Sequence, residues 1–364
     1  MTKRNRILAA LLFTGMAALL PGCATTPVSI AKVEFKGPVR SSFQNDASII
    51  SQDGGQSFPT PGGSLWTFGD TFLGSRDENG TPHFKGGGIF CSIAFLPKKD
   101  EQSFPPALRY KTGPDGAAVS PLSLLPGEKP GHDMIWPLAG VYANGKYYLY
   151  YTRVHKTGGG MWDFREVGSG LAECEKPLGE YRRLRPGGDW RFPVAPTQVL
   201  KAGPWLYLYE IVVRGDERGA GLARVKAAEI GSPAAYEYYH LPDESFRKEK
   251  SAQSILVPAA GQVSAAFDPY CQCWLMATSS DLFHPRRISL YRAPAPEGPW
   301  ECAGRIQVPE FCQGKQVTLA YCTYLHPELF RENGKVIALT FSVHLEDGGF
   351  DANCEMAEIT LERR

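Results

Sequence analysis

The sequence predicts an all-β protein built as a five-bladed β-propeller. Aromatic residues make up 12% of the 364-residue chain, which also contains 39 glycines and 29 prolines. Many short strands joined by many turns produce this composition. A pattern also recurs along the chain: a first strand, a turn, and then a second strand that is apolar or aromatic. Units of four antiparallel strands, repeated around an axis, make a propeller.

The recurrence has a period of about 68 residues. Its second strands centre near residues 66, 149, 207, 274 and 337. More strand-like sequence follows these occurrences and fills out four strands per unit, so five units give five blades. A β-sandwich is the alternative all-β architecture, but it would not explain recurrence at this spacing. We expect no long amphipathic helix.

The first repeat is a hairpin with an aspartate at each side. We expect strands at 47–51 and 64–69, with turn residues from Gly54 to Gly63 between them. Asp46 precedes the first strand and Asp70 follows the second, so an antiparallel hairpin would bring both carboxylates to its open end. Two neighbouring carboxylates can perform acid/base cleavage of a glycosidic bond. The alternative is that both aspartates cap turns.

Residues 1–22 have the features of an export signal. Basic residues at 3, 4 and 6 precede an apolar run from Ile7 to Leu20, which is too short to span a bilayer. The following Leu20-Pro21-Gly22-Cys23 resembles a bacterial lipoprotein lipobox. That resemblance implies cleavage before Cys23 and lipidation of this cysteine, and Ala24 favours the outer membrane. A plain signal peptide with an accidental cysteine is the alternative. Residues 23–34 would then form a tether and residues 35–364 the propeller.

Charge and cysteine content narrow the possible ligands. A formal net charge of +1 does not suggest nucleic-acid binding. Eight cysteines besides Cys23 suggest disulfides in an exported chain. Cys271 and Cys273 would share one strand face, which favours bridges from each of them to other strands. No histidine lies at a zinc-site spacing from the cysteines, and His155, His240 and His344 do not fall in a metal spacing. We therefore expect no metal and no cofactor.

A second carboxylate aligns with Asp70 in the repeat. Asp70 and Glu210 each lie seven residues after a turn glycine, which places them at the same rim on blades one and three. Partial burial at the end of an apolar strand raises the pKa of a carboxyl group. Glu210 is therefore a candidate catalytic acid. The alternative is a salt bridge with Arg153 or Arg214.

Four side chains near this rim are candidate sugar ligands. Sugar rings present apolar C–H faces that stack on aromatic side chains, and Trp136 and Tyr324 lie at strand ends. Arg153 can hold a ligand or neutralise a carboxylate. His326 can hydrogen-bond a sugar hydroxyl, although a structural role is the alternative for a lone histidine. The chain contains no GxSxG, P-loop or HExxH motif. We expect a monomer that binds an oligosaccharide or polysaccharide.

The hairpin also resembles a known group of proteins. Asn45-Asp46-Ala47-Ser48 and the stretch Leu65–Phe72 resemble the opening of five-bladed propellers long catalogued as a domain of unknown function. That group is associated with glycoside hydrolase family 183, endo-D-arabinanases. The resemblance implies a propeller over about residues 35–362 and places the family's paired aspartates on Asp46 and Asp70. Arabinanase-type propellers, a more distant resemblance, use a glutamate on a later blade as general acid, which implies this role for Glu210.

Two functions follow from these patterns. The first is a surface-tethered glycoside hydrolase that cleaves furanoside polysaccharides of the D-arabinan type with paired carboxylates. The second is a non-catalytic lipoprotein that binds a glycan or an envelope partner with the same face. Both place the protein in the cell envelope.

The lipobox resemblance gives a direct prediction. Replacing Cys23 with Ser removes the thiol that would carry the lipid, so the variant should leave the membrane fraction. Membrane fractionation of cells expressing each form measures this. Unchanged membrane association of Cys23→Ser would contradict the lipoprotein interpretation.

Overall fold

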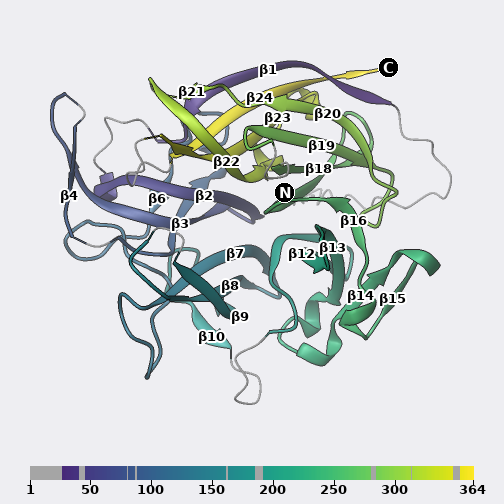
Figure 1. The fold of residues 1–364 in the computed structure, drawn as a ribbon, viewed down its shortest axis with the longest axis horizontal. Helices are drawn as coiled ribbons and strands as arrows, with labels where there is room; N and C mark the ends of the chain where they lie inside the picture. The colour runs from purple at the N-terminus through teal and green to yellow at the C-terminus, as the bar shows by residue number, and fades with distance from the viewer. Residues whose placement is uncertain are drawn as a thin grey trace, which may run out of the picture.

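The computed structural model describes residues 27–40, 46–79, 81–86, 88–160, 163–184, 192–279, 284–312, 314–346 and 353–364, with the backbone alone at residue 46. In this part of the chain the elements are strands and short 3-10 turns, without an α-helix. The strands form five sheets arranged around a central axis (Figure 1). The predicted all-β five-bladed propeller is confirmed.

Blades one and two come from the first half of the chain. Blade one contains β2 (Ile49–Thr60), β3 (Gly63–Arg76), β5 (Ser92–Pro97) and β6 (Arg109–Tyr110), with β4 (Pro82–Phe84) paired to β3. Blade two contains β7 (Asp133–Ala143), β8 (Lys146–Lys156), β9 (Phe164–Cys174) and β10 (Arg182–Leu184).

Blade three is a six-stranded sheet, and blade four, like blade two, is four-stranded. Blade three contains β11 (Pro196–Ala202), β12 (Trp205–Arg214), β13 (Glu217–Lys226), β14 (Glu237–His240) and β15 (Ser245–Arg247), with β16 (Ile255–Pro258) paired to β13. Blade four contains β17 (Val263–Asp268), β18 (Cys273–Ser279), β19 (Arg287–Ala293) and β20 (Glu301–Gln307).

Blade five combines both ends of the described chain. It contains β21 (Phe311–Cys312), β22 (Lys315–Leu325), β23 (Val336–Leu345), β24 (Asn353–Arg363) and β1 (Val28–Pro38). The 3-10 turns are η1 (Asp46–Ser48), η2 (Lys98–Asp100), η3 (Ala227–Glu229), η4 (Pro233–Ala235), η5 (Leu241–Asp243), η6 (Lys250–Ala252), η7 (Pro327–Leu329) and η8 (Glu332–Gly334).

Strand β1 completes the last blade. It pairs antiparallel with β24, from Val28 opposite Arg363 to Pro38 opposite Glu355, and the two strands run side by side in Figure 1. The predicted tether at 23–34 is therefore wrong from Val28 onward, because these residues cover the edge of β24 that would otherwise be unpaired. The predicted leader and Cys23 lie outside the described residues and stay predictions. None of the helices that the structure describes is long and apolar enough to cross a membrane.

The core is divided among the blade interfaces. The buried apolar residues that the structure describes form five clusters, and each cluster joins two neighbouring blades. Phe58 of blade one packs with Leu149 of blade two in one cluster, and Leu339 of blade five packs with Leu275 of blade four in another. Because five interfaces join five blades, the hydrophobic effect closes the ring.

The hairpin of blade one is longer than the sequence pattern suggested. We expected turn chemistry at Gly54-Gly55, but both residues lie inside β2, with φ angles of 86° and 90°. The turn is at residues 61–62, between Thr60 and Gly63. Two glycines with positive φ allow β-bulges, and the register of β2 against β3 shifts between Gln52 and Gly54 and again between Gly54 and Gln56.

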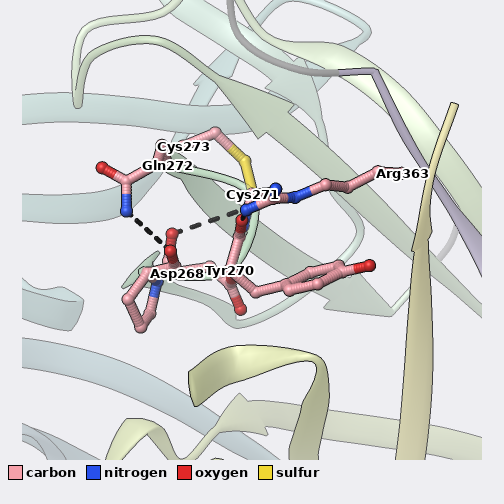
Figure 2. The surroundings of a disulfide bond; sticks show 7 residues. Asp268, Tyr270, Cys271, Gln272, Cys273 and Arg363 are labelled. Atoms are coloured by element: carbon pink, nitrogen blue, oxygen red, sulfur yellow. Dashed lines mark hydrogen bonds between the residues drawn. A yellow bond between two sulfur atoms is a disulfide. The ribbon is translucent and has the colours of Figure 1, made fainter. Parts of the chain in front are cut away.

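The expected bridges from Cys271 and Cys273 to other strands are not observed. The two cysteines form a disulfide with each other beside Asp268, and Arg363 lies over the Tyr270 ring (Figure 2). The expectation failed because Cys271 lies in the turn before β18, where a positive φ at Gln272 folds the chain back. The other cysteines of the described residues are free.

The packing of blade one against blade two predicts a mutation effect. A Cβ atom on Gly140 of β7 would overlap the Phe58 ring of β2. Gly140→Ala should therefore lower the free energy of unfolding by about 1–3 kcal/mol, as overpacking does. Gly159→Ala is the matched control, because its Cβ would meet open space. Denaturant titration measures both, and equal stability of the two variants would contradict this interface.

Candidate active site

The residue that lies opposite Asp70 in the hairpin is Asp53. Strand β2 pairs with β3 through Gln52 opposite Thr71 and Gly54 opposite Phe68, which places Asp53 beside Gly69 and Asp70. A Cβ atom on Gly69 would collide with Oδ1 of Asp53. The glycine therefore lets the Asp53 carboxyl group lie against the backbone of β3.

Asp53 is held by donors from two blades. The Tyr321 hydroxyl of β22 donates a hydrogen bond to Oδ2 of Asp53 at 3.0 Å. The backbone of Asp70 donates a second hydrogen bond to the same carboxyl group. The Tyr321 ring stacks on His344 with ring centroids 4.8 Å apart, so its orientation is supported. Asp53 nevertheless keeps partial solvent exposure.

Asp70 is held by blade two. The indole Nε1 of Trp136 in β7 donates a hydrogen bond to Oδ1 of Asp70 at 2.7 Å. The Trp136 ring meets Phe164 edge to face, with ring centroids 4.8 Å apart. Asp70 and Trp136 are both half-buried. Three blades thus place polar and aromatic groups around one carboxylate pair.

Burial shifts the titration of both aspartates. Burial, and then the neighbouring charge of Asp70, raise the pKa of Asp53 from 3.8 to about 7. Burial raises the pKa of Asp70 from 3.8 to about 6, although the Trp136 hydrogen bond acts in the opposite direction. Between these two values the pair holds one proton. A pair of carboxyl groups with one proton near neutral pH can supply a general acid and a general base.

Asp46, the partner we expected for Asp70, begins the 3-10 turn η1 before β2. Its side chain lies outside the described residues, so its catalytic role stays a prediction. The pairing of β2 with β3 begins at Ile49 opposite Leu73, which leaves the Asp46 backbone beyond the paired part of the hairpin. Counting back from the turn at Pro61-Gly62 reaches Asp53 opposite Asp70, and this is the signal that would have identified Asp53.

Glu210 lies in blade three and bonds to groups of the same blade. It is 3% exposed, and its Oε2 accepts hydrogen bonds from the Ala195 backbone and from Lys250, both at 3.0 Å. The ion pair is with Lys250 rather than with Arg153 or Arg214. In the part of the chain that the structure describes, Glu210 makes no hydrogen bond or ion pair with the aspartate pair.

Of the four expected sugar ligands, Trp136 alone is bonded to the aspartate pair. His326 is 0% exposed, and its ring stacks on Trp66 with ring centroids 4.3 Å apart. Its two ring nitrogens form hydrogen bonds with Ser57 and Thr340. Tyr324 is buried beside Cys322. Arg153 forms an ion pair with Glu128 at 3.0 Å. The geometry of His326 is that of a core residue, because both of its polar atoms are already bonded.

A family model described as "Domain of unknown function (DUF4185)" matches residues 44–346, most of the chain. The protein belongs to the DUF4185 family. The matched segment spans all five blades and includes Asp53, Asp70 and Trp136. Among curated proteins, none matches the sequence.

Solved structures share the fold at low sequence identity. A candidate hydrolase from Bacteroides ovatus ATCC 8483 is 17% identical, with a TM-score of 0.58 over 87% of both chains. A glycoside hydrolase family 43 enzyme from Xanthomonas citri, complexed with xylose, is 14% identical, with a TM-score of 0.52 over 88% of this chain and 89% of the other. CoXyl43, a family 43 β-xylosidase/α-arabinofuranosidase from a compost metagenome, is 14% identical, with a TM-score of 0.50 over 92% and 98%.

The raised pKa of Asp53 predicts how stability depends on pH. Between pH 3.8 and about 7 the folded protein keeps a proton that the unfolded chain has released, so its free energy of unfolding falls as pH rises. The fall is at most about 1.4 kcal/mol per pH unit for one proton. Asp53→Asn removes this carboxyl group, so its stability relative to the wild type should increase with pH across that window.

Thermal denaturation across this pH range measures the effect, and Asp216→Asn in an exposed turn is the matched control. A stability difference between Asp53→Asn and the wild type that does not change with pH would contradict the raised pKa.

Proposed function

We propose that this protein is a glycoside hydrolase that cleaves furanoside polysaccharides of the D-arabinan type. The observation that carries the proposal is the Asp53–Asp70 pair, two adjacent and partly exposed carboxyl groups with pKa values of about 7 and about 6. Hydrolysis of a glycosidic bond needs one protonated and one ionised carboxyl group, and this pair supplies both near neutral pH.

The environments of the two groups suggest their roles. Asp53 has the higher pKa and holds the proton, which it donates to the leaving-group oxygen as general acid. Asp70 is the ionised partner, to which Trp136 donates, and its charge stabilises the oxocarbenium-like transition state. Asp70 either takes the proton of the water that attacks the anomeric carbon or attacks that carbon itself, and water then releases the sugar. Trp136 also presents an aromatic ring beside the reacting groups, where the apolar face of a sugar can stack.

Family resemblance supports the substrate class. The Leu65–Phe72 stretch, which contains Asp70, resembles endo-D-arabinanases of glycoside hydrolase family 183. Two solved structures with this propeller fold are named for carbohydrate chemistry. One is a glycoside hydrolase family 43 enzyme in complex with xylose, and the other is a β-xylosidase/α-arabinofuranosidase. The resemblance of Leu20-Pro21-Gly22-Cys23 to a lipobox supports attachment to the cell envelope, where such a polymer would be encountered.

A panel of glycans tests the activity. Purified protein is incubated with D-arabinan, L-arabinan, xylan and galactan, and the reducing ends and product lengths are measured. The proposal expects short oligosaccharides from D-arabinan in preference to the others. Binding to D-arabinan without any cleavage would instead support the non-catalytic glycan-binding function.

The single proton that the Asp53–Asp70 pair holds near neutral pH predicts the rates of variants and the pH profile of the activity. Asp53→Asn and Asp70→Asn each remove a titrating group, so each should lower kcat by roughly 10²–10⁴-fold. The double variant should be little worse than the poorer single variant, because the two groups act as a unit. The dependence of kcat/KM on pH should be bell-shaped, with its maximum between pH values of about 6 and about 7.

Initial rates on the active polysaccharide measure these effects, with the melting temperature recorded for every variant. Glu210→Gln is the matched control, because Glu210 bonds within blade three. Wild-type rates in both Asn variants would rule out this active site. A loss in Glu210→Gln as large as theirs would assign the acid to Glu210 instead.

A further inference from the structure

We propose that His132, Asp133 and His155 bind a divalent first-row transition-metal ion. Asp133 begins β7 and His155 lies near the end of β8, directly opposite Asp133 in the strand pairing. His132 is the residue before Asp133. The hairpin therefore brings His155 to the adjacent residues His132 and Asp133, which precede it by more than twenty positions in the sequence.

The three side chains converge on a small volume. One ligand atom from each of the three lies within 4.8 Å of the others. Nε2 of His155 is 2.8 Å from Oδ1 of Asp133, and Nδ1 of His132 is 3.4 Å from the same oxygen. Ligand atoms around a metal with bonds of about 2.0–2.2 Å are separated by comparable distances. Small side-chain rotations would thus place an ion between them.

A second observation concerns the buried Nε2 atom of His155. This nitrogen lies 2.8 Å from Oδ1 of Asp133, an ion-pair distance, but makes no hydrogen bond within the described part of the chain. A buried polar atom without a hydrogen bond is uncommon and calls for an explanation such as an ion. The other Asp133 oxygen accepts a hydrogen bond from the Lys129 backbone at 2.5 Å, as the outer contacts of a metal-bound carboxylate do.

The ligand chemistry selects the class of ion. Imidazole nitrogens suit zinc, copper, nickel and iron, whereas calcium and magnesium prefer sites made of oxygen atoms. Half of the His132 side chain is exposed, so a bound ion would keep at least one position open to water or to a further ligand. We therefore use Zn²⁺ as the probe.

A bound ion would act on the aspartate pair through strand β7. Asp133 and Trp136 lie three residues apart in β7, and Trp136 donates to Asp70. A metal that joins His132 and Asp133 to His155 would hold the start of β7 against β8, the strand that follows it. Metal binding itself does not depend on the proposed hydrolase activity, so either proposal can fail alone.

Isothermal titration tests the site. The full-length protein is treated with a chelator, dialysed and titrated with ZnCl₂, with Mg²⁺ and Ca²⁺ titrated in parallel. We expect one equivalent of Zn²⁺ to bind, a higher melting temperature with Zn²⁺, and neither effect with Mg²⁺ or Ca²⁺. His132→Ala, at a half-exposed position, and His155→Ala each remove one ligand. Each variant should weaken Zn²⁺ binding by at least about tenfold, which is the smallest loss typical of removing even an outer contact of a metal site.

The matched control is His240→Ala. His240 bonds to Asp243 at 2.6 Å, so it forms a histidine–aspartate pair outside the proposed site. Its removal should leave Zn²⁺ binding unchanged. The proposal is overturned if the folded wild type does not bind Zn²⁺ saturably, if both His132→Ala and His155→Ala bind it like the wild type, or if His240→Ala loses binding to the same extent. Circular dichroism without metal checks that each variant is folded.

Discussion

Side-chain hydrogen bonds join neighbouring blades, because the backbone ladder of each sheet runs within its own blade. Ser342 accepts from the Gly54 backbone, and Ser264 accepts from the Leu325 backbone. His326 joins Ser57 in blade one to Thr340 in blade five through its two ring nitrogens. These polar groups are buried, so each needs a hydrogen-bond partner. Together the bonds hold neighbouring blades at the spacing that the apolar clusters require.

The aspartate pair depends on this ring. Enclosing two carboxyl groups is unfavourable, and donors that come from other blades offset part of the cost. Tyr321 reaches Asp53 from blade five, and Trp136 reaches Asp70 from blade two. An isolated hairpin from blade one would supply neither donor and would leave both groups in water, with ordinary pKa values. The chemistry proposed for the pair is therefore a property of three adjacent blades.

The histidine cluster also depends on pairing between distant residues, here within one blade. Asp133 and His155 meet because the β7–β8 hairpin pairs them, and His132 joins them from the adjoining turn. The strand that carries Asp133 also carries Trp136, so one strand start contributes to two sites.

The sequence by itself determined the all-β class and the number of blades. Aromatic strands and glycine turns at a regular spacing predicted five antiparallel units, because strand and turn preferences are local and their repetition is visible in the chain. It also singled out Asp70 and Trp136, which a hydrogen bond joins in the structure, while their roles stay predictions. Tertiary structure alone decided which groups meet them. Asp53 meets Asp70 when β2 pairs with β3, and the two register shifts around Gly54 cancel, so the count from the turn still holds. Val28–Pro38 is a strand because β24, more than three hundred residues later, supplies its partner. His326 is buried because blades one and five close around it. Register, ring closure and burial depend on contacts between distant segments, and a local pattern does not contain them.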